Sequence, residues 1–284
     1  MRALDPLDNK IEDFYEEIIT KSRKKVDYLE ISQYIIDNEA EYKNKGNTGS
    51  LYEFEANYAH PNSIIICQLS KKDVINIYTS YMVGPANDTL GRCIYNNIRS
   101  ITQNSKCPYC GHRNVSTVDH YLPKSNYPFL CVVMENLVPS CKDCNTDKKD
   151  KNITSNGDLI IHPYFDREID NYQWLFCKID LIDWKEDNIL LSFNVKSVDD
   201  FSQSLNERIT NHFDVLNLDN LYSIEAKEEF QNQMESFKEA IEPMANDLER
   251  YEHFSVLENK YTRRYKNSWQ RAFYQGLANY YLQV

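Results

Sequence analysis

The sequence predicts a mostly helical α+β protein. Apolar side chains recur at helical spacing in residues 8–22 and again from residue 199 to the end of the chain. Two β-rich runs, 174–182 and 189–195, are separated by the charged stretch WKEDN, which indicates an antiparallel hairpin. Between these patterns lies a cysteine-rich segment with short strand-like runs, 106–151, and the fold should be organised around it.

These patterns divide the 284 residues into three regions. We expect an N-terminal helical region over 1–105, a cysteine-rich core over 106–166, and the hairpin with further helices over 167–284. The length is sufficient for one large domain or two, each with its own hydrophobic core.

The N-terminal region should contain four helices. Ser70 and Asp73 have the spacing of an N-terminal capping box, and Gly84-Pro85 should end the helix that they start. The other helices and short elements are expected as a helix over 8–22, a helix over 29–42, a polar loop over 46–50, a short strand over 63–68 and a helix over 88–101.

The last helix is predicted as one continuous element over 255–282. One face carries side chains that step by four and should lie in the core: Tyr261, Tyr265, Trp269, Phe273 and Leu277. The opposite face is basic and is a candidate for contact with nucleic acid: Lys260, Arg263, Arg264 and Arg271.

Composition restricts the class of protein. The formal net charge of −11 argues against a protein that covers nucleic acid with its whole surface, although a local basic groove is compatible with it. No apolar run approaches the roughly 20 residues needed to span a bilayer, and no secretion signal follows the first residue. We therefore expect a cytoplasmic protein with no membrane contact.

Four of the eight cysteines form two Cys-x-x-Cys pairs, Cys107/Cys110 and Cys141/Cys144. In a reducing compartment such pairs favour metal over disulfides, and four thiolates match a tetrahedral structural zinc site. The two pairs are separated by 30 residues, so the zinc should close a loop that has a structure of its own. A small disulfide-stapled domain is the alternative.

The loop between the cysteine pairs should fold as strand, loop, strand and helix. Residues 116–121 can form the first strand, Leu137-Val138 the returning strand, and 141–149 a short helix. Asp119 and His120 are neighbours on the first strand, so their side chains should diverge unless the chain bends there.

The order DH…P…S…ENLVPSCKDCN, flanked by the Cys-x-x-Cys pairs, resembles the HNH nuclease family over residues 107–151. The resemblance implies a zinc-pinned ββα-metal (His-Me) finger and phosphodiester hydrolysis. Matched residue by residue, His120 is the general base that deprotonates water, and Asp119 is a ligand of one catalytic divalent cation. Asn136 orients the loop and the base, and Asn145 stands where some members have a histidine ligand. An amide in that place favours Mg²⁺ or Mn²⁺ over zinc.

Further residues are assigned supporting roles. Lys124, Lys148 and Lys149 are expected to contact phosphate, because residues 106–152 carry seven bases against five acids. Some HNH proteins with this zinc arrangement carry a similar HPYFD segment after the finger, so His162 is a possible support near the metal; a purely structural histidine is the alternative.

The resemblance therefore implies an endonuclease that cuts DNA with little sequence preference. The helical flanks resemble those of anti-phage effectors such as Septu, in which the nuclease works beside an ATPase, so an ATPase or another regulatory subunit is an expected partner. Two alternatives remain: a zinc-stabilised module that binds nucleic acid or protein without cutting, and a ribonuclease toxin that uses the same site.

Overall fold

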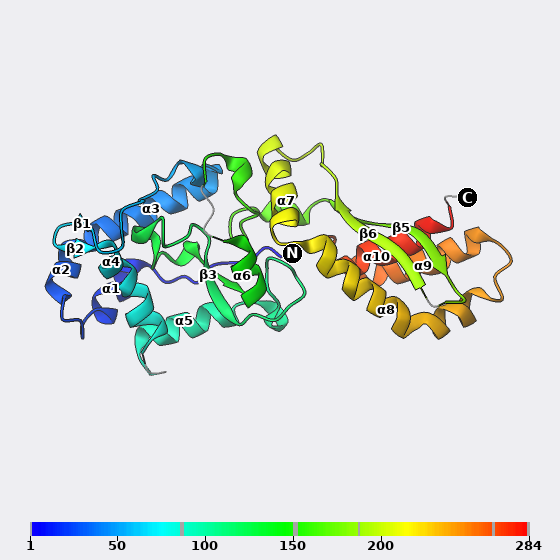
Figure 1. Cartoon of the computed structure of the whole chain (residues 1–284), viewed down its shortest axis with the longest axis horizontal. Coiled ribbons are helices and arrows are strands. Elements are labelled where there is room, and N and C mark those ends of the chain that lie inside the picture. Colours follow the sequence, from blue (N-terminus) through cyan, green and yellow to red (C-terminus); the bar gives the residue numbers. More distant parts are fainter. Residues whose placement is uncertain (1, 86–87, 150–152, 187, 263–264, 283–284) are drawn as a thin grey trace. The chain divides into compact units, whose positions relative to one another are not determined.

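The computed structural model describes residues 2–85, 88–149, 153–186, 188–262 and 265–282. The chain divides into two compact units (Figure 1). The N-terminal unit is formed by residues 3–167, and the C-terminal unit by residues 168–284 with residues 1–2. Helices predominate and the described strands form three two-stranded antiparallel sheets, which confirms the predicted α+β class. The expected N-terminal helical region and the cysteine-rich core share one unit.

The N-terminal unit surrounds the cysteine-rich finger with helices. Its elements are α1 (Ile11–Ile18), α2 (Lys25–Glu30), α3 (Ser32–Thr48), β1 (Ile64–Ile66), β2 (Leu69–Ser70), α4 (Lys71–Tyr78), a π-helical turn (Thr79–Val83), α5 (Leu90–Ser100), β3 (Thr117–His120), β4 (Leu137–Ser140) and α6 (Lys142–Lys148). Ser70 and Asp73 form the expected capping box at the start of α4.

Two N-terminal predictions were wrong in detail. The helix expected over 29–42 is divided at Ile31 into α2 and α3, and α3 continues through the expected polar loop as far as Thr48. Ile31 is fully buried, and the left-handed residue that ends α3 is Gly49.

Helix α5 packs closely on the π-helical turn at Gly91. A Cβ atom placed on Gly91 would overlap the carbonyl oxygen of Tyr81. We expect Gly91→Ala to lower the free energy of unfolding by about 1–3 kcal/mol, because backbone atoms must move to relieve this overlap. Helix propensity alone would make the alanine variant more stable by about 1 kcal/mol. A lower free energy of unfolding would therefore show that the overlap with Tyr81 outweighs helix propensity.

The measurement is the urea midpoint of the purified protein. Cys93→Ala, on the exposed face of the same helix, serves as the control and should change stability by less than about 0.5 kcal/mol. A more stable Gly91→Ala protein would contradict the close packing of the two segments.

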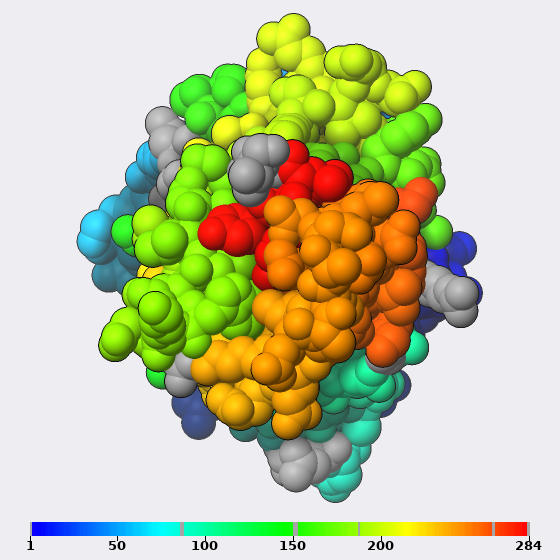
Figure 2. Space-filling view, turned by 90° about the vertical axis from the view of Figure 1, so that its right-hand side faces the viewer, coloured from blue at the N-terminus to red at the C-terminus, as the bar shows by residue number. Residues whose placement is uncertain are grey.

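In the described residues of the C-terminal unit, four helices pack with a hairpin. Its elements are β5 (Leu175–Asp183), β6 (Asn188–Val195), α7 (Gln203–Val215), α8 (Leu218–Ile241), α9 (Asp247–Thr262) and α10 (Trp269–Tyr280). The hairpin is the expected one, with Leu175 paired to Val195 and Asp183 to Asn188. Figure 2 shows α10 (red) between the hairpin (yellow-green) and α9 (orange), both of which it contacts. Helix α10 therefore forms the centre of this unit.

The last helix was predicted wrongly as one element, because the chain breaks between α9 and α10. Asn267 lies in the break with 3% exposure. Its Oδ1 accepts hydrogen bonds from the amides of Trp174 and Leu175, and its Nδ2 donates to the carbonyls of Ile169 and Tyr172. Ser268 then caps α10. The break therefore depends on contacts with a distant segment.

Within the described part of this unit, the expected basic face is divided between two helices: Lys260 is exposed near the end of α9, and Arg271 is paired at the start of α10. Arg271 forms an ion pair with Glu258 at 3.2 Å, and Lys266 donates to the carbonyl of Asn171 at 2.6 Å. Arg263 and Arg264, which belong to the same prediction, lie outside the described residues. Within the described ranges, none of the helices is long and apolar enough to cross a membrane.

Candidate nuclease site

The four cysteines of the two Cys-x-x-Cys pairs meet in one buried cluster. The sulfur atoms of Cys107, Cys110, Cys141 and Cys144 all lie within 4.8 Å of one another. A tetrahedral zinc with Zn–S bonds of about 2.3 Å separates its sulfurs by about 3.8 Å, so the cluster has the size of a zinc site. All four residues are at most 3% exposed. The arrangement is a closed structural site rather than a catalytic one.

Each cysteine pair is arranged so that backbone amides support a thiolate. The amide of Arg113 donates to Cys110 Sγ and the amide of Cys144 to Cys141 Sγ, both at 3.4 Å. The second bond also caps α6. Zinc binding and the start of the finger helix are therefore parts of the same local structure.

The predicted strand–loop–strand–helix lies between and at the two cysteine pairs of the cluster. Strands β3 and β4 pair antiparallel, with Asp119 opposite Val138 and His120 opposite Leu137. The chain bends directly after His120. A cavity of about 170 Å³ lies at this bend, and Asp119, His120 and Asn145 all line it. The structure thus brings together the three residues that the sequence assigned to base and cation binding.

His120 is held in one orientation. Its Nε2 lies 3.0 Å from the carbonyl oxygen of Cys131, and its ring packs edge-on against Tyr78. A carbonyl can only accept, so the neutral ring carries its proton on Nε2 and the lone pair on Nδ1. Burial, with a smaller effect of Lys124, lowers the pKa of His120 to about 3. The imidazole is therefore neutral at pH 7.

Asp119 is 4% exposed and is hydrogen-bonded within the finger. Its Oδ2 accepts a hydrogen bond from the Tyr109 hydroxyl at 2.9 Å and lies 3.3 Å from Lys148 Nζ. Burial raises the pKa of this carboxyl, while Lys148 and Tyr109 oppose the shift. Asn145, on α6, donates a long hydrogen bond of 3.4 Å to Thr117 Oγ1.

Lys148 lies elsewhere than expected. Its ammonium donates to the carbonyls of His120 and Tyr121 at 2.8 and 2.9 Å, and the residue is 7% exposed. In this position its ammonium is buried and supports the bend after β3, whereas a phosphate contact was expected to be exposed. Lys124 lines the cavity with its ammonium 5.7 Å from the Tyr78 ring centre, and Lys149 is exposed after α6. Lys151, counted in the basic balance of the finger, lies outside the described residues.

Asn136 is fully buried and bonds the loop that follows His120. Its Oδ1 accepts hydrogen bonds from the Leu122 amide and the Tyr42 hydroxyl, and its Nδ2 donates to the carbonyls of Leu122 and Leu130. Asn136 therefore fixes both ends of residues 122–130. It positions the site without lining the cavity.

We expect Asn136→Ala to lower the free energy of unfolding by about 3 kcal/mol, because four buried hydrogen bonds are lost. Asn267→Ala removes an equivalent set of four bonds in the C-terminal unit and is the matched control. Denaturant titration should show similar losses for both variants, but only Asn136→Ala should slow nucleic-acid cleavage. Equal effects of the two variants on cleavage would contradict a role of Asn136 in positioning the site.

His162 does not line the cavity but contacts the network around Asn136. Its Nε2 lies 3.1 Å from the Tyr42 hydroxyl, which donates to Asn136 Oδ1. Its Nδ1 accepts the amide of Tyr164 at 3.2 Å, so Nε2 carries the proton. The ring also packs on Tyr121 at 4.0 Å. In this position His162 supports residues 122–130 indirectly, through Tyr42 and Asn136, and it does not line the cavity where a cation is expected.

Some residues around the site were missed in the sequence. Tyr109 lies between two of the clustered cysteines and bonds Asp119, Tyr78 belongs to a distant helix and packs on His120, and the contact of His120 with Cys131 uses a backbone carbonyl. Only Tyr109 gave a signal, because a large aromatic residue inside a tight Cys-x-x-Cys turn must pack against something nearby.

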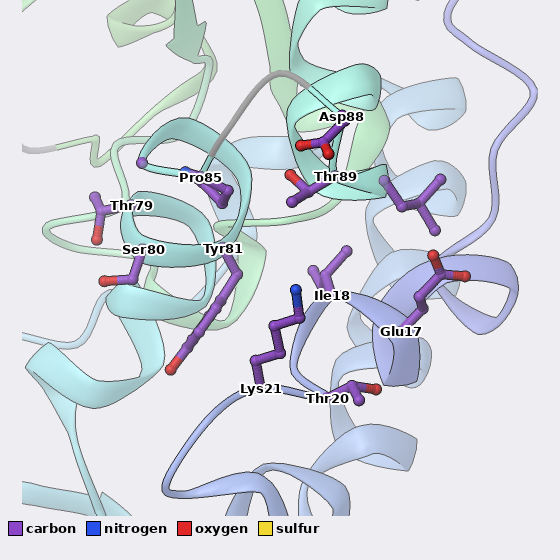
Figure 3. Close-up of a pocket in the computed structure, with 13 residues that line it drawn as sticks. Glu17, Ile18, Thr20, Lys21, Thr79, Ser80, Tyr81, Pro85, Asp88 and Thr89 are labelled. Atoms are coloured by element: carbon purple, nitrogen blue, oxygen red, sulfur yellow. The ribbon is translucent and has the colours of Figure 1, made fainter.

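A larger cavity of about 1010 Å³ lies between the end of α1, the π-helical turn and the start of α5 (Figure 3). Lys21 extends into it, and its walls include Glu17, Asp88 and Thr89. It contains no histidine or cysteine among its lining residues. The residues that the sequence assigned to base and cation binding line the smaller cavity and not this one.

The four-cysteine cluster and the ββα arrangement, with an Asp–His pair facing an Asn on the helix, are similar to the HNH nuclease domain that the sequence resembles. Residues 107–151 match the family described as HNH endonuclease, which confirms the expected resemblance. The domain lies entirely within the N-terminal unit.

Two relatives extend the similarity. The chain is 26% identical over 261 residues to protein ea31 of Escherichia phage lambda, an alignment that covers 86% of this chain and 84% of ea31. It is 43% identical over 68 residues to Septu protein PtuB of Bacillus thuringiensis, covering 22% of this chain and 26% of PtuB. No solved structure matches the chain.

Proposed function

We propose that the chain is a metal-dependent endonuclease that hydrolyses phosphodiester bonds in DNA. The observation that carries this proposal is the shared cavity of Asp119, His120 and Asn145. A base and two oxygen-bearing side chains that converge on one small space are what metal-assisted hydrolysis requires.

His120 is the residue proposed to act on water. Its Nδ1 lone pair accepts the proton of a water molecule in the cavity, while the Cys131 carbonyl keeps the ring oriented through Nε2. Burial lowers the pKa of this ring, which keeps it neutral before the reaction but makes it a weaker proton acceptor than an exposed histidine. Tyr78 packs against the ring and restricts its rotation.

Asp119 and Asn145 are the residues proposed to hold the catalytic cation. A carboxylate and an amide oxygen are hard ligands, and few protein ligands with room for water suit Mg²⁺ or Mn²⁺. Bound there, the cation supplies positive charge to the scissile phosphate and the leaving oxygen. Thr117 orients the Asn145 amide, and Tyr109 and Lys148 orient the carboxylate.

The distribution of charge supports contact with nucleic acid through the N-terminal unit. Residues 168–284 carry 21 acids and 12 bases, whereas residues 1–167 carry 22 acids and 20 bases. Most of the negative charge thus lies in the C-terminal unit, which repels phosphate. Lys124, which lines the cavity, and Lys149, which is exposed after α6, are proposed phosphate contacts, and such contacts give salt-sensitive binding with little sequence preference.

We place the protein in an anti-phage defence system, where an ATPase or another regulatory subunit would supply affinity for DNA. The similarity to PtuB supports this placement, and a cytoplasmic location would keep the four cysteines reduced for zinc. The similarity to phage protein ea31, which covers far more of the chain, favours a second candidate: a nuclease encoded on the phage side.

The activity is tested with purified protein, supercoiled plasmid and a structured RNA, each in Mg²⁺, Mn²⁺ or EDTA. The expected result is nicked and linear plasmid with either cation, and intact RNA. Degraded RNA beside intact plasmid would assign a ribonuclease. Metal-independent binding without any cleavage would assign a binding module.

The biological role is tested in two assays. Expression in a phage-sensitive host should lower plaque formation in the defence role, with a His120→Ala chain as control; unchanged plaques favour the phage-side role. Without a partner, plasmid cleavage should be weak at physiological salt and stronger at low salt. Vigorous cleavage by the isolated protein at physiological salt would overturn the need for a partner.

A further inference from the structure

Two buried side chains outside the assigned base and ligand set hold the carboxylate of Asp119. The Tyr109 hydroxyl donates to Oδ2 at 2.9 Å, and Lys148 Nζ lies 3.3 Å from the same oxygen. Tyr109, Asp119 and Lys148 are 0%, 4% and 7% exposed, respectively. The contacts are therefore shielded from water, and each is stronger than it would be at the surface.

Both contacts use the same carboxylate oxygen. Across the described ranges of the chain, each hydrogen bond and ion pair of Asp119 that involves its carboxylate goes to Oδ2. Oδ1 is then the oxygen left for the cavity that Asp119 lines. A carboxylate fixed through one oxygen presents the other in a single direction.

The two side chains come from segments that the zinc cluster anchors. Tyr109 stands between the zinc ligands Cys107 and Cys110, and Lys148 ends the helix that contains Cys144. Lys148 also binds the carbonyls of His120 and Tyr121, at the bend where the base is placed. The geometry therefore connects the structural zinc site to both reactive residues.

We propose that Tyr109 and Lys148 are positioning residues for the catalytic cation: they hold Asp119 through Oδ2 so that Oδ1 faces the cavity. This inference rests on the proposed role of Asp119 as a cation ligand. Hydrogen-bonding partners of metal ligands typically change metal affinity or activity by about 10- to 100-fold when they are removed. Tyr109→Phe deletes a single hydroxyl and is the sharper of the two tests.

The experiment measures Mn²⁺ affinity of the full-length, zinc-loaded protein by the electron paramagnetic resonance signal of free Mn²⁺. Tyr109→Phe should weaken binding by about tenfold with one zinc retained per chain. Lys148→Met should weaken it by at least as much. Tyr164→Phe is the matched control: it removes another buried hydroxyl, which donates to the carbonyl of Leu137, and should leave the Mn²⁺ affinity unchanged.

Asp119→Asn separates this inference from the proposed function. If wild-type protein binds no Mn²⁺, or Asp119→Asn binds it normally, the proposed cation site itself is wrong. If Asp119→Asn abolishes binding but Tyr109→Phe binds like the wild type, only the positioning role is overturned. Loss of zinc in Tyr109→Phe or Lys148→Met would assign that side chain to the zinc fold and also reject its role in positioning.

Discussion

Replacing His120 by alanine is expected to lower the rate of plasmid cleavage by about 10²- to 10⁴-fold, the usual contribution of a general base. The effect should be large because, of the residues that line the cavity, only His120 offers an imidazole. The single-turnover rate in excess enzyme, measured at saturating Mg²⁺, reports the chemical step directly.

The control for this variant is His60→Ala, which removes an exposed histidine whose ring nitrogen accepts the amide of Asn62. Its cleavage rate should equal that of the wild type. His120→Ala must also retain zinc and its melting temperature, since the edge-on contact with Tyr78 is lost. A well-folded His120→Ala protein that cuts at the normal rate would remove the base from the mechanism.

Removing the structural zinc should unfold the finger. Structural zinc contributes about 10–16 kcal/mol in small zinc-binding peptides, comparable to or greater than the 5–15 kcal/mol that stabilises a typical domain. Replacing Cys107 and Cys110 by serine should therefore abolish zinc binding, cleavage and the protection of finger amides from hydrogen exchange. The C-terminal unit, which contributes no ligand to the cluster, should keep its protected amides.

Cys67→Ser and Cys93→Ser are matched controls, because both residues are exposed and lie outside the cluster. They should retain one zinc and full cleavage activity. A zinc-free double variant with native exchange protection in residues 107–149 would show that the finger folds without metal.

The finger could be predicted closely because its constraints are local. The cysteine spacing set its ends, and the described strands and helix lie within a few residues of the expected ones. The hairpin of the C-terminal unit could also be predicted from the sequence, because β5 and β6 are rich in branched and aromatic residues and flank a charged turn.

The remaining differences have tertiary causes. The break before α10 depends on Asn267 reaching the amides of Trp174 and Leu175, more than 90 residues away in sequence. The position of Lys148 follows from two carbonyls at the end of β3, which no periodicity within α6 reveals. A local pattern shows which face a residue occupies but not which backbone groups lie opposite that face.

The separation of the two cysteine pairs also affects the order in which the parts of the finger are completed during synthesis. Thirty residues lie between Cys110 and Cys141, so the second pair leaves the ribosome only after the base has been synthesised. Until the metal is captured, Tyr109 has no rigid turn from which to hold Asp119. If the chain is the nuclease proposed above, we expect a newly made chain to be inactive until its four cysteines bind zinc.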